Sequence, residues 1–215
     1  MASRRVSDDD PFPTAPADPP VRVAEVADRA DVVATTVAAF EHDPAFRYFF
    51  PDDDRYHAQA TAFAEHLFDK RVGHGTVWVT DRCEAASLWS PPANRTSEAD
   101  AARLADGHRA MLRRIGDDAA AWLDAYERAV EPELPEDNDY WYLGILACHP
   151  AHAGRGFGGA VMRAGIQFVR ANDGVAYLET TNPADVAYYE AAGWRLTATI
   201  NATTPSTIFV LRIGV

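Results

Sequence analysis

The run from His149 to Ala160 has the composition of a turn that could bind an anion. It follows the apolar, strand-like stretch 140–148 and precedes an amphipathic helical pattern. A strand, a glycine-rich turn and a helix start bring unpaired backbone N–H groups to one point, and the first turn of a helix adds partial positive charge. The pattern therefore predicts a site for a phosphate-bearing ligand. The glycines of the run are Gly154, Gly156, Gly158 and Gly159.

Two common phosphate-binding motifs do not fit this run. Gly154, Gly156 and Gly159 match the dinucleotide fingerprint G-x-G-x-x-G, but residues 150–153 separate the strand from the first glycine. Only about 60 residues follow, too few for the two mononucleotide-binding halves of that fold. A P-loop needs Gly-Lys-Ser/Thr, and the only lysine of the chain, Lys70, lies elsewhere. The alternative is that the glycines serve backbone geometry alone.

A second motif follows the glycine-rich run. Residues 178–183 read L-E-T-T-N-P, residues 188–190 read Y-Y-E, and residues 193–194 read G-W. The two motifs together resemble those of the GNAT superfamily of N-acetyltransferases, roughly V-x-P-x-x-[RQ]-G-x-G-[IL]-G and then L-E-T-x-N with F-Y-E-x-x-G-F. Two motifs in this order are more specific than either alone. The resemblance extends over about residues 21–213.

The resemblance implies a single domain over residues 21–215 with an α/β (α+β) fold. Its sheet is expected to be mixed, mostly antiparallel and splayed, with helices on its faces. It also implies acetyl-CoA (coenzyme A) as cofactor and transfer of the acetyl group to an amine. Residues 1–20, rich in proline and aspartate and without an apolar core segment, predict a disordered leader and not a signal peptide.

The same resemblance assigns cofactor-binding residues. Main-chain groups near Leu146 and Cys148 are expected beside the acyl group, and Asn182 beside the pantetheine arm, although Asn182 could simply form a turn before Pro183. The family usually has Arg or Gln where this chain has Ala153, so one side chain that helps to hold the pyrophosphate is missing. The residues expected around the pyrophosphate are Gly154, Arg155, Gly156, Phe157, Gly158 and Gly159.

Tyr189 matches the tyrosine of the family motif and is the candidate general acid. A phenol of pKa ~10 stays protonated at neutral pH and can protonate a leaving thiolate of pKa ~8.5; the alternative is a packing role, which we expect for Tyr188. Glu179 is the candidate base that deprotonates the amine through water, or else a structural hydrogen-bond acceptor. A covalent mechanism through Cys148 needs an activating group, and His149 is expected on the opposite face of the strand.

The acceptor amine is expected to meet carboxylates and aromatic rings. Glu41 and Asp43, with His42 between them, could recognise a cation, or could belong to a solvated loop. Aromatic side chains bind flat or amphipathic amines well, although each could equally be a core residue. The aromatic candidates are Phe46, Tyr48, Phe49, Phe50, Trp89, Trp141 and Tyr142.

The composition limits the partners. The net charge of −12 argues against nucleic acid or an anionic membrane, and it is compatible with a cationic substrate or with solubility alone. Cys83 and Cys148 are too few for a disulfide framework or a zinc site, so we expect buried free thiols in strands and no metal. No apolar run reaches the ~18 residues of a membrane span, so a cytoplasmic location is expected.

The elements that would carry these residues follow from the hydrophobic patterns. Residues 41–51 and 131–139 are predicted to be loops. Helices are predicted at 28–40, 53–70, 97–130 with a break near Gly116, after the glycine-rich turn, and at 184–192. Strands are predicted at 21–24, 76–80, 84–89, 140–148, 175–180, 195–202 and 207–213.

The resulting hypothesis is an acetyl-CoA-dependent N-acetyltransferase that acts on a small amine by direct transfer. The resemblance favours an antibiotic or other xenobiotic acceptor, such as a puromycin-like amine, but a shared fold does not determine the substrate. Two alternatives stay open. One is acetylation of a protein N-terminus or lysine, and the other is a non-catalytic module that binds or senses acyl-CoA.

Overall fold

The computed structural model describes residues 19–95, 97–201 and 206–214. Most of the predicted leader, residues 1–18, lies outside this range. Within the described residues no helix is both long and apolar enough to cross a membrane.

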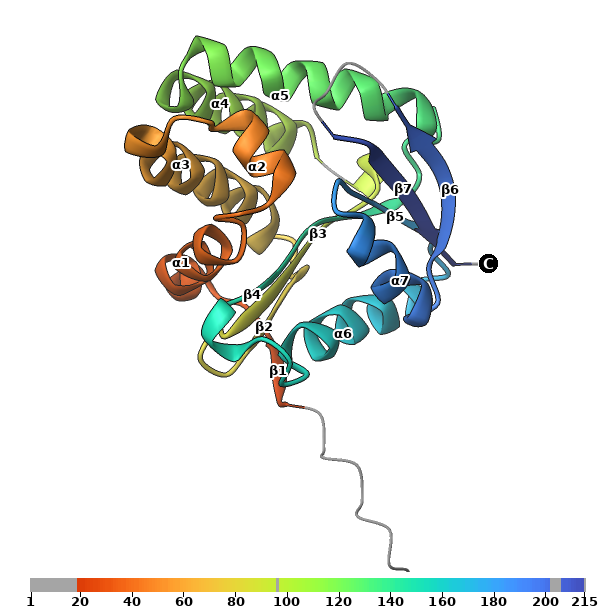
Figure 1. Cartoon of the computed structure of the whole chain (residues 1–215). Coiled ribbons are helices and arrows are strands. Elements are labelled where there is room, and N and C mark those ends of the chain that lie inside the picture. The colour runs from red at the N-terminus through yellow and green to blue at the C-terminus, as the bar shows by residue number, and fades with distance from the viewer. Residues whose placement is uncertain (1–18, 96, 202–205, 215) are drawn as a thin grey trace, which may run out of the picture.

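A seven-stranded open sheet runs through the molecule in the order β1-β2-β3-β4-β5-β7-β6 (Figure 1). All neighbours are antiparallel except β4 and β5, which are parallel. The predicted mixed, mostly antiparallel sheet is therefore confirmed. The strands are β1 (Val21–Val23), β2 (Val77–Thr80), β3 (Ala85–Ser90), β4 (Trp141–Cys148), β5 (Ala176–Thr180), β6 (Arg195–Ile200) and β7 (Ile208–Ile213).

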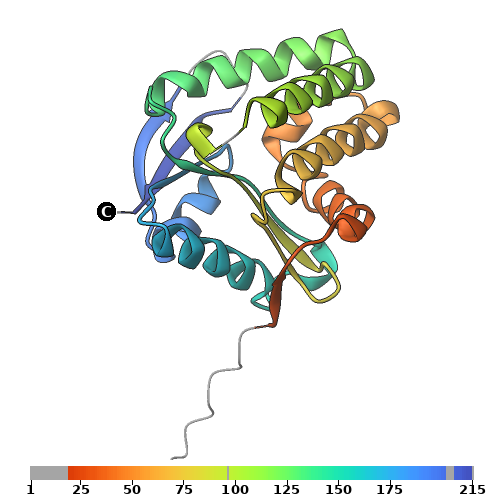
Figure 2. The ribbon, with the colours of Figure 1, turned by 180° about the vertical axis from the view of Figure 1, so that it is seen from behind.

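Helices cover both faces of the sheet (Figures 1 and 2). Five of them, α1 to α5, pack on one face around a core that includes Phe50, Phe68 and Ile145, whereas α6 and α7 pack on the other around Trp89 and Trp194. Each face thus has its own buried apolar cluster. The helices are α1 (Arg29–Ala39), α2 (Pro44–Phe49), α3 (Asp53–Val72), α4 (Glu98–Ile115), α5 (Asp117–Val130), α6 (Phe157–Ala171) and α7 (Pro183–Ala191).

Helix ends follow capping chemistry. The Ser97 hydroxyl accepts from the Asp100 N–H at the start of α4, and Gly116, with φ of 87°, ends that helix as predicted. The predicted loop over residues 41–51 was wrong in its middle, because α2 lies there. Asp43 caps the N–H groups of α2, and Pro44 takes its first position, where no N–H is needed.

Both cysteine predictions need correction. Cys83 is buried, but it lies in the turn between β2 and β3 with a φ of 56°, not in a strand. Cys148 ends β4 as expected, but it is only half-buried. Neither forms a disulfide.

A bulge and a divergence of strands shape the centre of the sheet. Between β3 and β4 the register passes from Leu88↔Ile145 to Trp89↔Leu143, so Gly144 is an extra residue on β4. Between β4 and β5 only two pairs form, Trp141↔Ala176 and Tyr142↔Tyr177. Beyond Tyr142 the parallel strands separate, and the resulting gap is the predicted splay of the sheet.

Candidate active site

The glycine-rich turn has the backbone geometry that its composition predicts. Gly154 and Gly156 have φ values of 74° and 83°, which side chains disfavour, and α6 begins directly after Gly156. The Ala160 N–H already bonds to the Gly156 carbonyl at 3.0 Å. The three preceding N–H groups have no carbonyl partner of this kind, so the start of α6 presents donors to the turn. One of them, the N–H of Gly158, donates to the Cys148 thiol.

Positive charge gathers at this turn although Ala153 offers none. The Arg155 guanidinium lies over the Phe157 ring at 5.2 Å and contacts the His152 ring, with 3.0 Å between Nη1 and Nδ1. Arg163, one turn into α6, lies over Gly159: a Cβ there would come within 3.0 Å of its Nη1. Arg163 has no motif around it, and sequence reasoning missed it.

Backbone alternation directs donors of β4 into the gap. The His149 N–H bonds to the Glu84 carbonyl beside β3 at 2.8 Å. Because alternate residues of a strand direct their N–H groups to opposite neighbours, those of Leu146 and Cys148 point away from β3, toward the gap. Burial raises the pKa of the Cys148 thiol, which is the wrong direction for a nucleophile.

Residues after β5 border the same gap. The Asn182 side chain caps α7 by accepting from the Ala184 N–H at 3.1 Å, and its amide donates to Asp185 at 3.2 Å. The turn-forming role considered for Asn182 is therefore present. Thr181 is buried, and its hydroxyl has no hydrogen-bond partner among the described residues. A buried, unpaired hydroxyl of this kind fits a polar group supplied by a ligand.

The two neighbouring tyrosines of α7 differ in their surroundings. Tyr189 is 9 % exposed, lies against the Trp194 ring, and has its pKa raised by burial. Tyr188 is 44 % exposed, although we expected it to be packed. Its hydroxyl lies 3.8 Å from where a Cβ on Gly158 would be. The more accessible phenol at the glycine-rich turn thus belongs to Tyr188.

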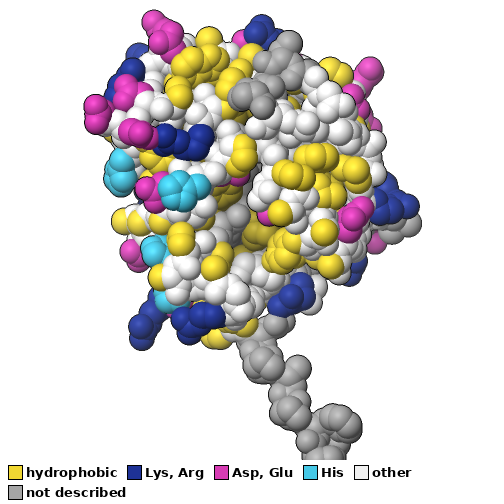
Figure 3. Space-filling view, in the orientation of Figure 1, with side chains coloured by type: hydrophobic (Ala, Val, Ile, Leu, Met, Phe, Trp, Pro, Cys, Tyr) yellow, Lys and Arg dark blue, Asp and Glu magenta, His cyan; other side chains and the backbone are white. Residues whose placement is uncertain are grey.

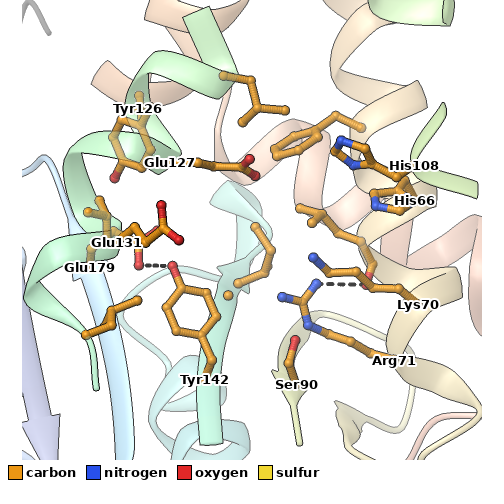
Figure 4. Close-up of a pocket in the computed structure, with 18 of the residues that line it drawn as sticks. His66, Lys70, Arg71, Ser90, His108, Tyr126, Glu127, Glu131, Tyr142 and Glu179 are labelled. Atoms are coloured by element: carbon orange, nitrogen blue, oxygen red, sulfur yellow. Dashed lines mark hydrogen bonds between the residues drawn. The ribbon is translucent and has the colours of Figure 1, made fainter. Parts of the chain in front are cut away.

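A cavity of about 830 Å³ opens between α2–α5 and the diverging strands. Glu179 of β5 and Tyr142 of β4 share its wall, and the Tyr142 hydroxyl donates to the Glu179 carboxylate (Figure 4). Burial raises the pKa of Glu179 to about 7, although the Tyr142 hydrogen bond opposes this shift. A carboxylate with such a pKa can exchange a proton near neutral pH. In the space-filling view the molecule is hollowed near the middle of this face (Figure 3).

The substrate candidates divide between the cavity and the cores. Asp43, Phe46, Phe49 and Tyr142 line the cavity. The others do not line it. Glu41 is exposed, Tyr48 packs on Trp122, and Phe50 lies in the core under α1 to α5. Trp89 and Trp141 are buried on the α6 face of the sheet. There Trp89 lies against Gly165, and Trp141 lies against Phe168.

Sequence reasoning missed the charged residues that α3, α4, α5 and the segment 131–136 after α5 bring to the cavity. Their only signal was that Lys70 is the sole lysine and precedes an arginine at the end of a predicted helix. Nothing in their spacing along the sequence predicts that they lie near β5 in the fold. The missed residues are His66, Lys70, Arg71, His108, Glu127, Glu131 and Glu136.

The splayed sheet, the glycine-rich turn and the adjoining cavity form the arrangement that the two motifs predict for an acyltransferase. Residues 76–194 match the model of the acetyltransferase (GNAT) family. The chain belongs to this family, whose members are acyltransferases that generally use acetyl-CoA.

Solved structures share the fold at low sequence identity. A histone acetyltransferase HPA2-related acetyltransferase from Corynebacterium glutamicum is 24% identical, with a TM-score of 0.66 over 91% of this chain and 96% of that one. The polyamine N-acetyltransferase of Drosophila melanogaster is 18% identical (TM-score 0.62, 92% and 100% covered). Arylalkylamine N-acetyltransferase 2 from Aedes aegypti is 10% identical (0.62, 91% and 98%). At these identities the likeness concerns the fold.

Proposed function

We propose that the protein is an acetyl-CoA-dependent N-acetyltransferase that acetylates a small-molecule amine by direct transfer. The observation that carries this proposal is the gap between β4 and β5. The glycine-rich turn follows β4, Asn182 follows β5, and the cavity with Glu179 opens at the same strands. A donor and an acceptor bound at these two places would meet where the strands diverge.

The described residues fit coenzyme A. The N–H groups at the start of α6 suit the pyrophosphate, with Arg155 and Arg163 supplying charge, and the β4 edge and Asn182 border the path of the pantetheine arm. Bound as acetyl-CoA, the cofactor supplies an activated acyl group. The main-chain N–H groups that β4 directs into the gap are suited to stabilise negative charge on an acyl oxygen.

The proton transfers are assigned to side chains that border the gap. Glu179 accepts a proton from the acceptor ammonium, directly or through water, since its pKa of about 7 suits a base at neutral pH. Tyr142 holds the Glu179 carboxylate in place. Tyr189, by its match to the family motif, donates a proton to the departing thiolate, and Tyr188 is the second candidate because its hydroxyl lies at the turn.

Two observations favour a small amine over a protein acceptor. The cavity of about 830 Å³ has the size of a small-molecule site, and similar folds include enzymes named for polyamines and arylalkylamines. Resemblance of residues 21–50 and of residues 76–92, which contain the antiparallel pair β2 and β3, to puromycin N-acetyltransferase adds antibiotics and other xenobiotic amines to the candidates.

The test is a panel of amines incubated with acetyl-CoA, with release of free CoA followed by a thiol reagent. The panel contains puromycin, putrescine, agmatine, phenethylamine, free amino acids and a peptide with a free N-terminus. We expect release with small amines and little with the peptide. Binding of acetyl-CoA without CoA release from any amine would instead support a non-catalytic binding module.

A further inference from the structure

Two cations of α3 lie in the cavity without a carboxylate partner. Arg71 is 1 % exposed, and its guanidinium makes one hydrogen bond, from Nη1 to the Leu67 carbonyl at 3.0 Å. Its Nε has no hydrogen-bond partner, and among the described residues no acidic side chain forms an ion pair with Arg71 or Lys70. Buried charges in proteins are normally paired, so these two cations call for an anion from outside the chain.

A glycine on β4 makes room for the Arg71 side chain. Gly144, the bulge residue of β4, leaves room for it: a Cβ there would come within 2.1 Å of the Arg71 Nη2. The neighbouring Lys70 points into the cavity (Figure 4). Burial lowers the pKa of Lys70 to about 7 and that of Arg71 to about 10, and the Arg71 charge lowers the pKa of Lys70 further. The more distant carboxylates of Glu127 and Glu179 oppose the shift of Lys70, and Glu179 opposes that of Arg71, but none of them forms an ion pair with either cation. A bound anion would restore the charge of Lys70.

Acidic groups occupy the opposite wall. Figure 4 shows Glu127, Glu131 and Glu179 across the cavity from Lys70 and Arg71. Glu179 is half-buried beside the strand gap, where the reacting amine must lie, whereas Glu131 is exposed at the rim and is screened by solvent. The buried part of the cavity is therefore bipolar, with the proposed base at one end and unpaired cations at the other.

Apolar side chains line the cavity between its acidic wall and its two cations. They come from α2, α3, α4 and α5, and several are aromatic. A ligand that spans the cavity therefore needs an apolar body. These side chains are Phe46, Phe49, Phe63, Met111, Leu123 and Tyr126.

We propose that the acceptor is a zwitterion, namely an amino acid or a close derivative with an apolar or aromatic side chain. Its amine faces Glu179, and its carboxylate is held by Arg71 and Lys70. This inference rests on the proposed function and narrows the amine class. A polyamine would bring a second cation toward Arg71 and Lys70, and like charges at close range oppose binding.

Matched acceptors test the proposal in the unmodified protein. Phenylalanine is compared with phenethylamine, leucine with isoamylamine, and both pairs with putrescine, by kcat/KM for CoA release. A charge-assisted carboxylate contact should favour the amino acid of each pair by about tenfold or more. Equal or faster turnover of the amines that lack a carboxylate, or a preference for putrescine, would overturn the proposal.

A binding measurement separates this inference from the proposed function. Calorimetry compares N-acetylphenylalanine with N-acetylphenethylamine, which differ only in the carboxylate. About tenfold tighter binding of the carboxylate is expected even if no amine is turned over. In that outcome the catalytic proposal fails and the anion site stands, whereas equal affinities contradict the anion site whatever the turnover.

Variants locate the effect. Lys70→Met and Arg71→Met should each lower kcat/KM for phenylalanine by about tenfold and change that for phenethylamine by less than about threefold. Arg113→Met, an exposed change on α4, is the matched control and should alter neither. Because Arg71 is buried, its variant is scored only if circular dichroism shows a native fold, and Lys70→Met keeps the test decisive. Equal losses for both acceptors would assign the cations a merely structural role.

Discussion

The glycine-rich turn takes all its parts from one continuous stretch, β4 to α6, whereas the cavity takes most of its charged side chains from α3, α4, α5 and β5, which lie far apart in the sequence. In the proposed function the turn binds the cofactor mainly through backbone N–H groups, which need glycines at defined positions and therefore leave a motif in the sequence. The cavity would bind the acceptor through side chains that tertiary packing brings together. A donor site can accordingly be shared across a family while the acceptor site changes from member to member.

The largest effect on activity is expected from a change in the cavity, where the acceptor would bind. Glu179→Gln removes the proposed base and should lower kcat/KM about 100- to 1000-fold near neutral pH, in line with general base catalysis. Affinity for CoA, measured by calorimetry, should stay unchanged, because the turn lies on other residues. A small loss of activity, or a loss that comes with weaker CoA binding, would contradict the division between a cofactor site at the turn and an acceptor site in the cavity.

The pH profile examines the same carboxylate. Because burial raises the pKa of Glu179 to about 7, the base is protonated below that pH, and kcat/KM should rise through about pH 7 and then level. Phenethylamine is the acceptor for this measurement, since it has no carboxylate for Lys70, whose pKa is also about 7. Glu179→Gln should lose this limb, and Tyr142→Phe should shift it upward by removing a hydrogen bond to the charged form.

The sequence predicted the glycine-rich turn more fully than the cavity, and the reason is physical. Positive φ at Gly154 and Gly156, and the strand and helix on either side, follow from local composition and periodicity. The partners of Glu179 depend instead on how α3 and α5 pack against the sheet, which no local pattern encodes. Trp89 and Trp141 illustrate the same limit, because aromatic type alone does not say which face of the sheet buries a ring.

The tyrosine pair gives an intermediate effect. Tyr189→Phe should lower kcat about 10- to 100-fold with little change in KM, because it removes the proposed proton donor and leaves the ring in the core. Tyr188→Phe is the matched control, with the same atom removed one residue away, and should lower kcat by less than about threefold. Pre-steady-state and steady-state kinetics measure both, and the reverse order would transfer the acid role to Tyr188.

A smaller effect is expected from the backbone of the turn. Gly156→Ala places a Cβ at a φ of 83°, which costs about 1–2 kcal/mol for a side-chain residue, and should weaken CoA binding about tenfold. Gly73→Ala is the control, since its φ is −66° and no heavy atom lies within 4 Å of the added Cβ. Unchanged affinity in Gly156→Ala would mean that the turn does not bind the cofactor in this geometry.

The smallest change concerns the residue by which this chain departs from the family motif. Ala153 is exposed beside the turn, so Ala153→Arg can be accommodated without disturbing a core. If the N–H groups of α6 and the guanidinium groups of Arg155 and Arg163 already hold the pyrophosphate, the added charge should tighten CoA binding only about threefold at low salt, and less as salt screens it. Arg163→Ala should loosen binding by more than Ala153→Arg tightens it. A large gain from Ala153→Arg would instead mean that the missing side chain limits the donor site, and that the turn, like the cavity, depends on more than its backbone.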